Sequence, residues 1–513
     1  MPVQVSDRIK PFLSSASLNE APQNLGVALD ENYKVVSKLE DFSDLSDEER
    51  FLAGLSTLLF NVQDEQLDYF NQADVQELLE MINILISERL NDVMHRAEFQ
   101  DLESTWRSIE HLIQDVNFLA GVKIDLLDAS KEELAEDFKN NAIDIFRSAL
   151  FQKVYIEEYD QYGGEPYGVM LGLYEFKNTP DDMTWLRTMA KIGNACHAPF
   201  ISSIHPRFFG VNTAEEVTGI KDLAGMLSHP KYGRWNALRE TEEAAYLGLT
   251  FPRYVLRLPY NPDANPCRSI NFVEKVAEGT KEGLEIQKTD GANRNADGYL
   301  WGSSSVLLVK NLIRSFETSG WCQHIRGPKG GGLVDGLPTH SYMLRGRDDF
   351  QLPVELVIPD FRELELANLG FIPLIYKKGS AQATFFSVQS AKRPARLKDP
   401  HDAQNSQLVC NLAYTLSVTR IAHYIKCIMR DNIGSTADDS YIQRVINNWL
   451  GGYVTTVMNP DDLTLRYYPF KAIDVQVEKR EGQIGFYDCT VSVLPHMQFE
   501  GSDVELRIES RLG

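Results

Sequence analysis

Residues 64–159 have hydrophobic side chains at steps of three and four, the spacing that places them along one side of an α-helix. We expect one helix near 75–93 and a second near 99–113, whose apolar positions are Val75, Leu78, Leu79, Ile82, Leu85, Ile86, Leu90 and Val93, then Phe99, Leu102, Trp106, Ile109 and Ile113. A third helix is predicted over 130–159, because Ser130 and Glu133 have the spacing of a capping box. The pattern leaves open whether the first two stripes face the chain's own core or a partner.

From residue 161 to about 431, short apolar runs alternate with helical stretches. The predicted strands are 167–176, the end of 184–204, 254–260, 353–359 and 371–377, and the predicted helices are the start of 184–204, then 301–320, 361–369 and 405–431. This alternation is typical of an α/β core. The stretch 261–298 is rich in Pro, Asn and Gly, so we expect it to be an insertion on the surface.

The end of the chain alternates apolar and polar residues with a period of two, which predicts half-buried antiparallel strands. The apolar positions are Ile473, Val475 and Val477, then Tyr487, Cys489, Val491 and Val493, and finally Val504, Leu506 and Ile508, the last three interleaved with Glu505, Arg507 and Glu509. The final strand can pair within its own domain or with the sheet edge of another chain.

These changes of pattern divide the chain into four parts. They are a polar, acidic segment (1–60), a helical region (61–160), an α/β core (161–400) and a C-terminal part with a helix and strands (401–513). The predicted fold class is therefore α/β, with a helical N-terminal region, a mixed sheet in the core and a β-rich C-terminal segment.

Net charge, cysteine spacing and hydropathy argue against several classes of protein. The chain has 513 residues and a formal net charge of -22, which argues against a nucleic acid or an anionic membrane as its main partner. Its six cysteines form no C-x-x-C pair, so they have neither zinc-ligand spacing nor the density of a disulfide scaffold. The N-terminus does not have the pattern of a secretory signal peptide, and no run of about 18 apolar residues predicts a membrane span. A reducing cytoplasm is the simplest location.

The stretch "IRGPKGGGLVDGLPTH" (325–340) has five glycines within 327–336 and contains Lys329, as phosphate-binding loops do. A Walker loop, however, requires Ser or Thr directly after the lysine, and here Gly330 follows. A dinucleotide fingerprint must open a helix, whereas Gly336 and Pro338 are helix-ending residues. We favour a tightly turned loop over a nucleotide site.

No other group of residues predicts a reaction. Cys196 and His197 are adjacent and should point apart, and His111 and His423 lack the spacing of a zinc helix. Glu363 and Glu365 are two places apart and should lie on different faces of a helix. We therefore expect no enzyme, and no catalytic, cofactor-binding or metal-binding residues.

Many blocks resemble, in order and spacing, the large sheath subunit of the bacterial type VI secretion system (the TssC or VipB family). They are "FQDLESTWRSIEHLIQDV" (99–116), "GEPYGVMLGLYEF" (164–176), "HAPFISSIHPRFFG" (197–210), "RWNALRETEEAAYLGLTFPRYVLRLPY" (234–260), "YLWGSSS" (299–305), "SGWCQHIRGPKGGGLVDGLPTH" (319–340), "ELANLGFIPLIYKKGSAQATFF" (365–386), "RIAHYIKCIMRDNIGS" (420–435) and "LPHMQFEGSDVELRIESRLG" (494–513). The resemblance extends over roughly 95–513. It places the glycine-rich loop in a block of a structural family without a nucleotide site.

The resemblance implies a contractile tail-sheath-like fold and a structural role. Members pair with a small sheath subunit (TssB or VipA), and the heterodimers form a helical tube around an inner tube of hexameric rings. The tube is assembled in the cytoplasm on a membrane-anchored baseplate, and its contraction propels the inner tube. The candidate contacts for the small subunit are Leu78, Leu79, Ile82, Leu102 and Trp106; those for a strand shared between protomers are Val504, Leu506, Arg507, Ile508 and Glu509.

Two alternatives remain at this stage: a sheath protein of another phage-tail-like particle, and a nucleotide-binding enzyme that uses 327–336. In many members of the family a recycling AAA+ ATPase (ClpV) recognises an N-terminal helix. Residues 1–60 have no clear match to it, and the short stripe Val5, Ile9, Phe12 and Leu13 is interrupted by Pro11. Recognition by that ATPase is therefore an open question from the sequence.

Overall fold

The computed structural model describes residues 72–268, 270–276, 298–344, 347–395, 398–399, 403, 406–407, 409–432, 439–455, 457, 460–479, 487–496 and 506–511. The chain divides into two compact units. The first comprises Met1–Arg96 and Pro259–Lys275, and the second comprises Ala97–Leu258 and Val276–Gly513. In the first unit the described part consists of helix α4 (Gln72–Met94) and the segment 259–275, and every other element below belongs to the second unit.

The first two predicted helices are present as α4 and α5 (Ala97–Ile113). The prediction of one helix over 130–159 was wrong in its length. Helix α6 (Lys131–Asn140) starts with the predicted capping box of Ser130 and Glu133, but it ends at Asn141. Asp144 and Ser148 then use their side chains to cap new turns, and this competition with the helix backbone explains the break.

The rest of the 113–160 region is built of short helical turns. They are η2 (Phe118–Ala120), η3 (Ile145–Arg147), α7 (Ala149–Phe151) and the π-helix η4 (Gln152–Tyr159).

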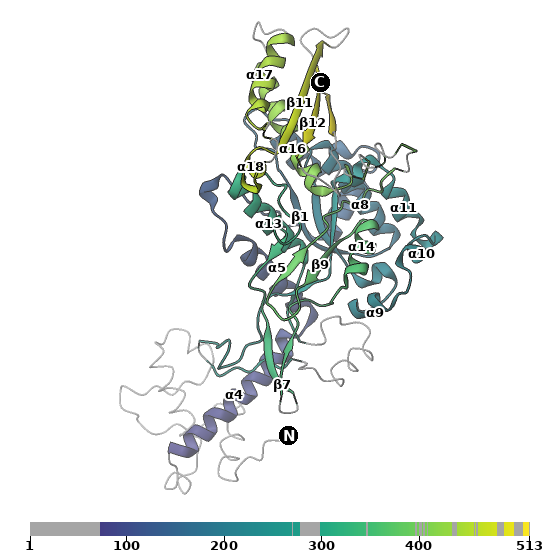
Figure 1. Cartoon of the computed structure of the whole chain (residues 1–513). Helices are drawn as coiled ribbons and strands as arrows, with labels where there is room; N and C mark the ends of the chain where they lie inside the picture. Colours follow the sequence, from purple (N-terminus) through teal and green to yellow (C-terminus); the bar gives the residue numbers. More distant parts are fainter. Residues whose placement is uncertain are drawn as a thin grey trace, which may run out of the picture. The chain divides into compact units, whose positions relative to one another are not determined.

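A mixed six-stranded sheet forms the centre of the second unit (Figure 1). Its strands, in spatial order, are β1 (Met170–Phe176), β2 (Phe200–Ile204), β3 (Leu247–Phe251), β9 (Ile372–Tyr376), β10 (Ala383–Phe385) and β6 (Leu333–Val334). The first four are parallel to one another, and β10 is antiparallel to both β9 and β6. Strands β2, β3 and β9 are buried along their whole length, which explains their near-continuous apolar sequences.

Helices cover both faces of this sheet, and alternate strand residues supply the two cores. Phe200 and Ile204 of β2 pack in one hydrophobic cluster with α8 (Pro180–Ala195) and α11 (Gly233–Arg239). Ile201, between them, packs in the other cluster with α13 (Ser304–Ser319). Figure 1 shows α13 and α5 on one side of the sheet and α8 and α11 on the other. The predicted α/β class with a mixed sheet is thereby confirmed.

The remaining elements of this α/β part are short, apart from α14. They are η5 (Pro206–Phe209), α9 (Ala214–Gly219), α10 (Leu223–Leu227), η6 (Pro230–Tyr232), η7 (Glu242–Tyr246), β4 (Tyr254–Val255), β5 (Trp301–Gly302), β7 (His340–Leu344), β8 (Arg347–Gln351) and α14 (Asp360–Asn368). Strands β4 and β5 pair with each other, and β7 and β8 form a hairpin.

The strand predictions for 254–260 and 353–359 were wrong. Only Tyr254 and Val255 of the first form a strand. The second makes a single bridge, between Val354 and Tyr254. Its alternation is still that of a half-buried strand, because Val354, Leu356 and Ile358 are buried. Prolines 353 and 359 end the segment on both sides, so it cannot extend a ladder.

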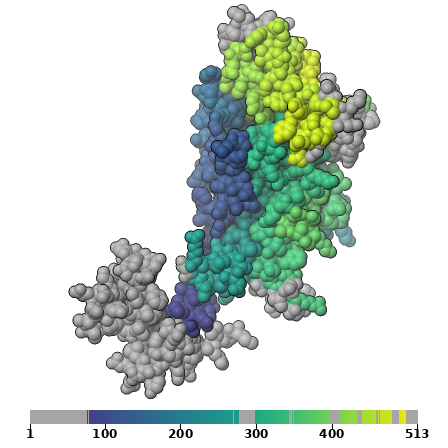
Figure 2. Space-filling view, turned by 60° about the vertical axis from the view of Figure 1, so that its left-hand side comes forward, coloured from purple at the N-terminus to yellow at the C-terminus, as the bar shows by residue number. Residues whose placement is uncertain are grey.

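The C-terminal part is a three-stranded antiparallel sheet packed on helices. Strands β11 (Phe470–Lys479), β12 (Tyr487–Pro495) and β13 (Leu506–Arg511) are in spatial order, and the helices are α16 (Leu412–Asp431), α17 (Asp439–Gly451) and α18 (Asp462–Tyr467). The predicted alternation is confirmed for β11 and β12, since Val475, Val477, Cys489, Val491 and Val493 are all buried. These residues form a third hydrophobic cluster with α16 and α17. Figure 2 shows the yellow C-terminal strands beside the yellow-green helices.

None of the helices in the described ranges is long and apolar enough to cross a membrane.

Candidate assembly surfaces

Helix α5 turns several polar and small side chains inward and most of its large hydrophobic ones outward, with Leu112 as the buried exception. Gln100 and Ser108 are buried together with Leu112. Two of the predicted contact residues lie on the opposite side, where the exposed fraction is 57% for Leu102 and 61% for Trp106. Single hydrophobic residues are common on protein surfaces. In α5, however, polar residues are buried while apolar residues are exposed, so that the amphipathicity of the helix is inverted, and such an arrangement is typical of a binding surface. The stripe therefore does not serve the chain's own core.

Polar contacts hold the inward side of α5 in place. The Arg257 guanidinium donates two hydrogen bonds to the Glu103 carboxylate, with N–O distances of 2.7 and 3.1 Å. Ser104 Oγ donates to the backbone oxygen of Trp301 at 2.8 Å. The fork geometry of arginine and carboxylate fixes orientation as well as position. The rotation of α5 about its axis is thus set by these polar contacts, and the apolar stripe stays on the outside.

His111, near the end of α5, lies on the same inward side. Its Nδ1 is 2.7 Å from the hydroxyl of Tyr254, a fully buried residue. Burial, with a smaller effect from Lys310, lowers the pKa of His111 to about 4. His111 lies on the polar side of its helix, and that side is the packed one. The imidazole is neutral near pH 7 and contributes to packing.

The stretch between α5 and β1 exposes further large apolar side chains. They are Phe118, Leu119, Leu126, Leu127, Ile143, Phe146, Ile156 and Tyr162. Together with Phe99, Leu102, Trp106 and Ile113 of α5 we call them the α5 surface. Figure 2 shows the blue residues of this part of the chain together along one side. The sequence patterns did not identify those in 118–146, because they lie in short turns without a helical period. The feature of the sequence that could have indicated this surface is the high number of large apolar residues in 118–146, a segment without a regular period.

Helix α4, in the first unit, also exposes apolar side chains. The exposed fractions are 45% for Leu79, 50% for Leu85 and 46% for Val93. Ile82 is half-buried, and the side chain of Leu78 lies outside the described residues. Of the predicted contacts on α4, Leu79 is thus placed at the surface.

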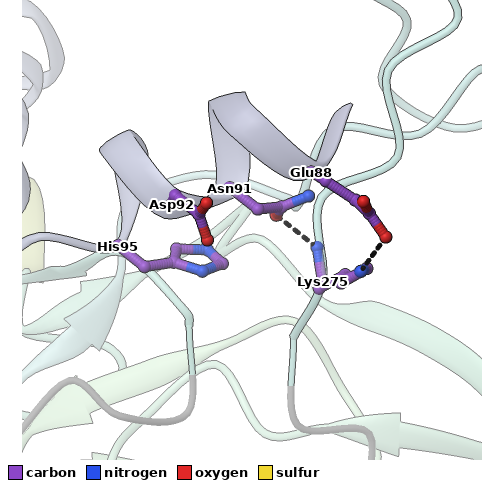
Figure 3. A pocket seen from close by; sticks show the side chains of 5 residues that line it. All are labelled: Glu88, Asn91, Asp92, His95 and Lys275. Atoms are coloured by element: carbon purple, nitrogen blue, oxygen red, sulfur yellow. Dashed lines mark hydrogen bonds and ion pairs between the residues drawn. The ribbon is translucent and has the colours of Figure 1, made fainter. Parts of the chain in front are cut away.

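A polar pocket of about 530 Å³ lies where α4 meets the segment 259–275 (Figure 3). Its lining residues are Glu88, Asn91, Asp92, His95 and Lys275. Asn91 accepts a hydrogen bond from the backbone N–H of Lys275 and donates to the backbone oxygen of Val273, at 2.7 and 3.1 Å. In the part of the chain that the structure describes, no three His, Cys, Asp or Glu residues are grouped to hold a metal ion. The polar groups of this pocket fasten α4 to the 259–275 segment.

The terminal strand β13 pairs with β12 of its own chain. The register joins Leu506 to Val493, Ile508 to Val491 and Arg511 to Asp488. Arg507 and Glu509 are in the same strand, and Val504 lies outside the described residues. Because β13 and β11 are the two edges of the sheet, each has one side without a strand neighbour in the described chain. Exchange of a strand between protomers stays a prediction.

The glycine-rich loop is packed against strand β10 by its own backbone. The N–H of Gly327 donates to the oxygen of Phe385 at 2.7 Å, and the N–H of Phe385 donates to the oxygen of Gly332 at 3.0 Å. Gly331 has a φ of 90°, and a Cβ there would lie 2.0 Å from the backbone oxygen of His324. A Cβ on Gly332 would lie 2.4 Å from the oxygen of Phe385. These glycines are therefore required by close backbone packing.

Strand β6 follows these glycines where a phosphate loop would continue into a helix, and the N–H groups of Gly327 and Gly332 donate to backbone oxygens of the chain itself. Arg314 donates to the backbone oxygens of Gly331 and Leu333, at 3.0 and 2.7 Å. The preference for a tight structural turn is consistent with this geometry.

The remaining candidates of the sequence have structural partners. The thiol of Cys196 donates to the oxygen of Ile192, and burial raises its pKa to about 12, so it is no nucleophile at neutral pH. Glu365 accepts hydrogen bonds from the backbone N–H groups of Leu223 and Ala224, at 2.8 and 3.2 Å. Glu363 is buried, and burial raises its pKa. The two carboxylates do not converge on a common site.

Two family models match nearly all of the described chain. The first is the EvpB/VC_A0108 tail sheath N-terminal domain, matching residues 76–392, and the second is the EvpB/VC_A0108 tail sheath gpW/gp25-like domain, matching 401–512. The chain is 38% identical over 443 residues to the type VI secretion system sheath protein TssC1 of Pseudomonas aeruginosa, which covers 85% of this chain and 86% of that protein.

Among solved structures, a chain of the anti-feeding prophage baseplate aligns with 77% of this chain and 80% of its own length. Its sequence identity is 11% and its TM-score is 0.31, a similarity too weak to support an argument.

Proposed function

The chain belongs to the TssC/VipB family of type VI secretion sheath proteins, and from this premise we propose that it pairs with a small, TssB/VipA-like subunit. The pairs polymerise into a helical tube, and contraction of this tube propels an inner tube of hexameric rings. The family is structural, and the protein is not an enzyme. Its work is the conversion of one packing of subunits into another of lower free energy.

The observation that carries the proposal is the inverted amphipathicity of α5. Leu102 and Trp106 are more than half exposed, while the buried contacts of the helix come largely from polar groups. Large, rigid aromatic side chains on a surface are the residues that most often dominate the free energy of protein association. We assign the α5 surface to the small subunit, with Leu78, Leu79 and Ile82 of α4 as a second contact.

The C-terminal sheet supplies the candidate contact between protomers. A strand from a neighbouring chain can add to either edge, or β13 can leave its own β12 and pair elsewhere, in both cases through main-chain hydrogen bonds. Leu506, Arg507, Ile508 and Glu509 would then form the shared strand, together with Val504. Such bonds would keep protomers connected while their rigid parts re-pack.

The remaining partners of this proposal are the inner tube and a membrane-anchored baseplate, with assembly in the cytoplasm. A ClpV-type ATPase is a further candidate partner. The segment 1–60, to which this last question belongs, lies outside the described residues.

The test is co-expression of the full chain with a TssB-like subunit, followed by size-exclusion chromatography and negative-stain electron microscopy. We expect tubes with a hollow lumen that are absent when either chain is omitted. A doubly charged variant, Leu102→Asp with Trp106→Asp, should abolish the pairwise complex. The matched control is Phe361→Asp with Leu364→Asp on α14, whose exposed fractions of 68% and 58% are similar. This control should leave the pairwise complex intact.

Deletion of 504–513 examines the strand separately. We expect the pairwise complex to survive and the tubes to be lost. A full-length chain that stays monomeric and is indifferent to the small subunit would contradict the proposal.

A further inference from the structure

A group of titratable side chains, of which Lys426 is buried and His197, His423 and Arg430 are half-buried, plays no part in the surfaces described above. His423, Lys426 and Arg430 follow one another at steps of three and four on α16, so they share one side of the helix. This side contacts the C-terminal end of the π-helix η4 and the turn after α8. Ile421, Ile425 and Met429 belong to the hydrophobic cluster formed with β11 and β12.

The two cations of α16 hold the end of η4. Lys426 Nζ is 2.8 Å from Asp160 Oδ1 and 3.8 Å from the centre of the Tyr159 ring. Arg430 donates to the backbone oxygens of Tyr159 and Gln161, at 2.9 and 2.5 Å. The last carbonyls of a helix have no partners within it and carry partial negative charge, so cations there are stabilising.

The two histidines complete the contact. His423 Nε2 is 2.9 Å from the backbone oxygen of Cys196, and since a carbonyl only accepts, Nε2 carries the proton. His197 has a φ of 49°, in the left-handed region, and its Nδ1 is 3.1 Å from the Tyr246 hydroxyl. The Tyr159 ring lies against both imidazoles, with centroids 5.9 Å from that of His197 and 5.4 Å from that of His423. Three elements thus meet at Tyr159.

The contact joins parts of the chain that match different family domains. Helix α16 lies in the gpW/gp25-like match, whereas η4, α8 and η7 lie in the N-terminal match. The start of α16 also packs in the core of the α/β part, through Leu412, Ala413 and Leu416. The position of α16 therefore determines how the C-terminal sheet is held on the α/β part.

We propose that His423, Lys426 and Arg430 form, with Tyr159, Asp160 and His197, a latch between the two matched domains that stays closed only while both histidines are neutral. This α16 latch is a conformational device within a single chain. It goes beyond the sheath role and does not depend on a partner subunit.

The surroundings of the imidazoles explain why protonation opens the latch. Burial lowers the pKa of His197 to about 4, with further effects from His423 and Lys426. Burial also lowers the pKa of His423 to about 4, and the cations Lys426 and Arg420 add to the effect. The other groups that face them, Tyr159, Tyr246 and the Cys196 thiol, are neutral because burial raises the pKa of each. Asp160 is already paired with Lys426.

Proton binding determines the direction in which pH shifts the latch between its closed and open states. In the open state a histidine has a pKa of about 6.5, above its value in the closed latch, so the open state binds more protons between pH 6.5 and 4. The latch is fully closed above pH 6.5 and weakens as the pH falls. Between pH 7.5 and 5.5, the opening equilibrium should rise about tenfold for each histidine that is released.

Hydrogen exchange of the full-length chain tests the latch, after correction for the pH dependence of the chemical exchange rate. We expect protection of 421–431 to fall about tenfold or more between pH 7.5 and 5.5, with α13 as the internal reference. His197→Asn with His423→Gln removes both titrating groups, while asparagine tolerates the left-handed conformation and glutamine can still donate to Cys196. This variant should keep its protection at pH 7.5 and lose the response to pH.

A second variant removes the cation and does not depend on the histidine variant folding well. Lys426→Met should lower protection of 421–431 at both pH values. Its matched control is Lys310→Met, which removes a lysine that pairs with Asp115 at 2.8 Å on α13 and should leave 421–431 unchanged. Protection of α16 that is independent of pH in the unmodified chain, or unaffected by Lys426→Met, would overturn the latch. None of these readouts requires tubes, so such a failure would leave the sheath role untouched.

Discussion

Helices α5 and α13 pack against each other in the second unit, yet they use their apolar residues in opposite ways. Helix α13 buries Val306, Leu307, Leu308 and Val309 in the hydrophobic cluster that it shares with strands of the central sheet. Helix α5 turns Leu102 and Trp106 outward and keeps Gln100 and Ser108 inside. The apolar residues of α13 thus stabilise the fold of this chain, whereas those of α5 are exposed and could contact a partner.

The comparison also shows how an inverted helix can be stable. Only Leu112 of α5 joins the hydrophobic cluster of α13. The other inward contacts include directed polar bonds, such as the pair of Glu103 and Arg257 and the bond from Ser104 to the backbone of Trp301. Directed bonds specify one rotation of the helix, whereas a second apolar face would allow the stripe to turn inward. The apolar stripe is thus exposed in the part of the chain that the structure describes.

The largest effect is expected from a truncation in α13. Leu308→Ala should reduce the free energy of unfolding by ~2–5 kcal/mol, because it leaves a cavity in the hydrophobic cluster around α13. Urea denaturation of the isolated chain measures it. A loss below ~1 kcal/mol would mean that α13 does not have the core role assigned to it.

Truncation on α5 should separate binding from stability. Trp106→Ala should change the free energy of unfolding by less than ~0.5 kcal/mol, since the side chain is 61% exposed. The same change should weaken binding of the small subunit by ~2 kcal/mol, a factor of ~30 in Kd, if Trp106 is a central contact. Calorimetric titration of both proteins gives the Kd. If Trp106→Ala left the affinity for the small subunit unchanged and greatly reduced the free energy of unfolding, Trp106 would have a core role and not a binding role.

The smallest effect concerns the pH dependence of stability that comes from His111, which packs against Tyr254 at the end of α5. Because the pKa of His111 in the folded chain is about 4, below its value of about 6.5 when unfolded, the unfolded state binds more protons between these values. Neutral His111 therefore makes its full contribution to the free energy of unfolding above pH 6.5, and this contribution is lost as the pH falls toward 4. We expect ~1 kcal/mol less stability at pH 5 than at pH 7, after allowance for partial exposure.

His111→Gln can still bond to Tyr254 but does not titrate, so it should lack this part of the pH dependence. Urea denaturation of the two proteins at both pH values isolates the contribution of His111 from that of the other histidines. Identical pH dependence in both would show that His111 is not held neutral by its packing.

The sequence was informative wherever one local pattern determined the structure. The helices α4 and α5 and the alternation in β11 and β12 follow from periodicity, and the strands β1, β2 and β9 follow from short apolar runs. It failed where local and distant contacts compete. Strand β3 was not predicted, and 353–359 has the burial of a strand but only one bridge to Tyr254.

What the sequence by itself determined is the α/β class with many of its helices and strands, the absence of a phosphate-loop pattern and the resemblance to a sheath family. These depend on neighbours within a few positions or on long ordered blocks. Only the tertiary structure decided that the stripe of α5 faces outward, because this depends on Arg257 and Trp301, more than 150 positions away. It also decided that His197 and His423, 226 positions apart in the sequence, lie at one contact around Tyr159. Periodicity shows that a helix has an apolar side, and long-range contacts determine what that side faces.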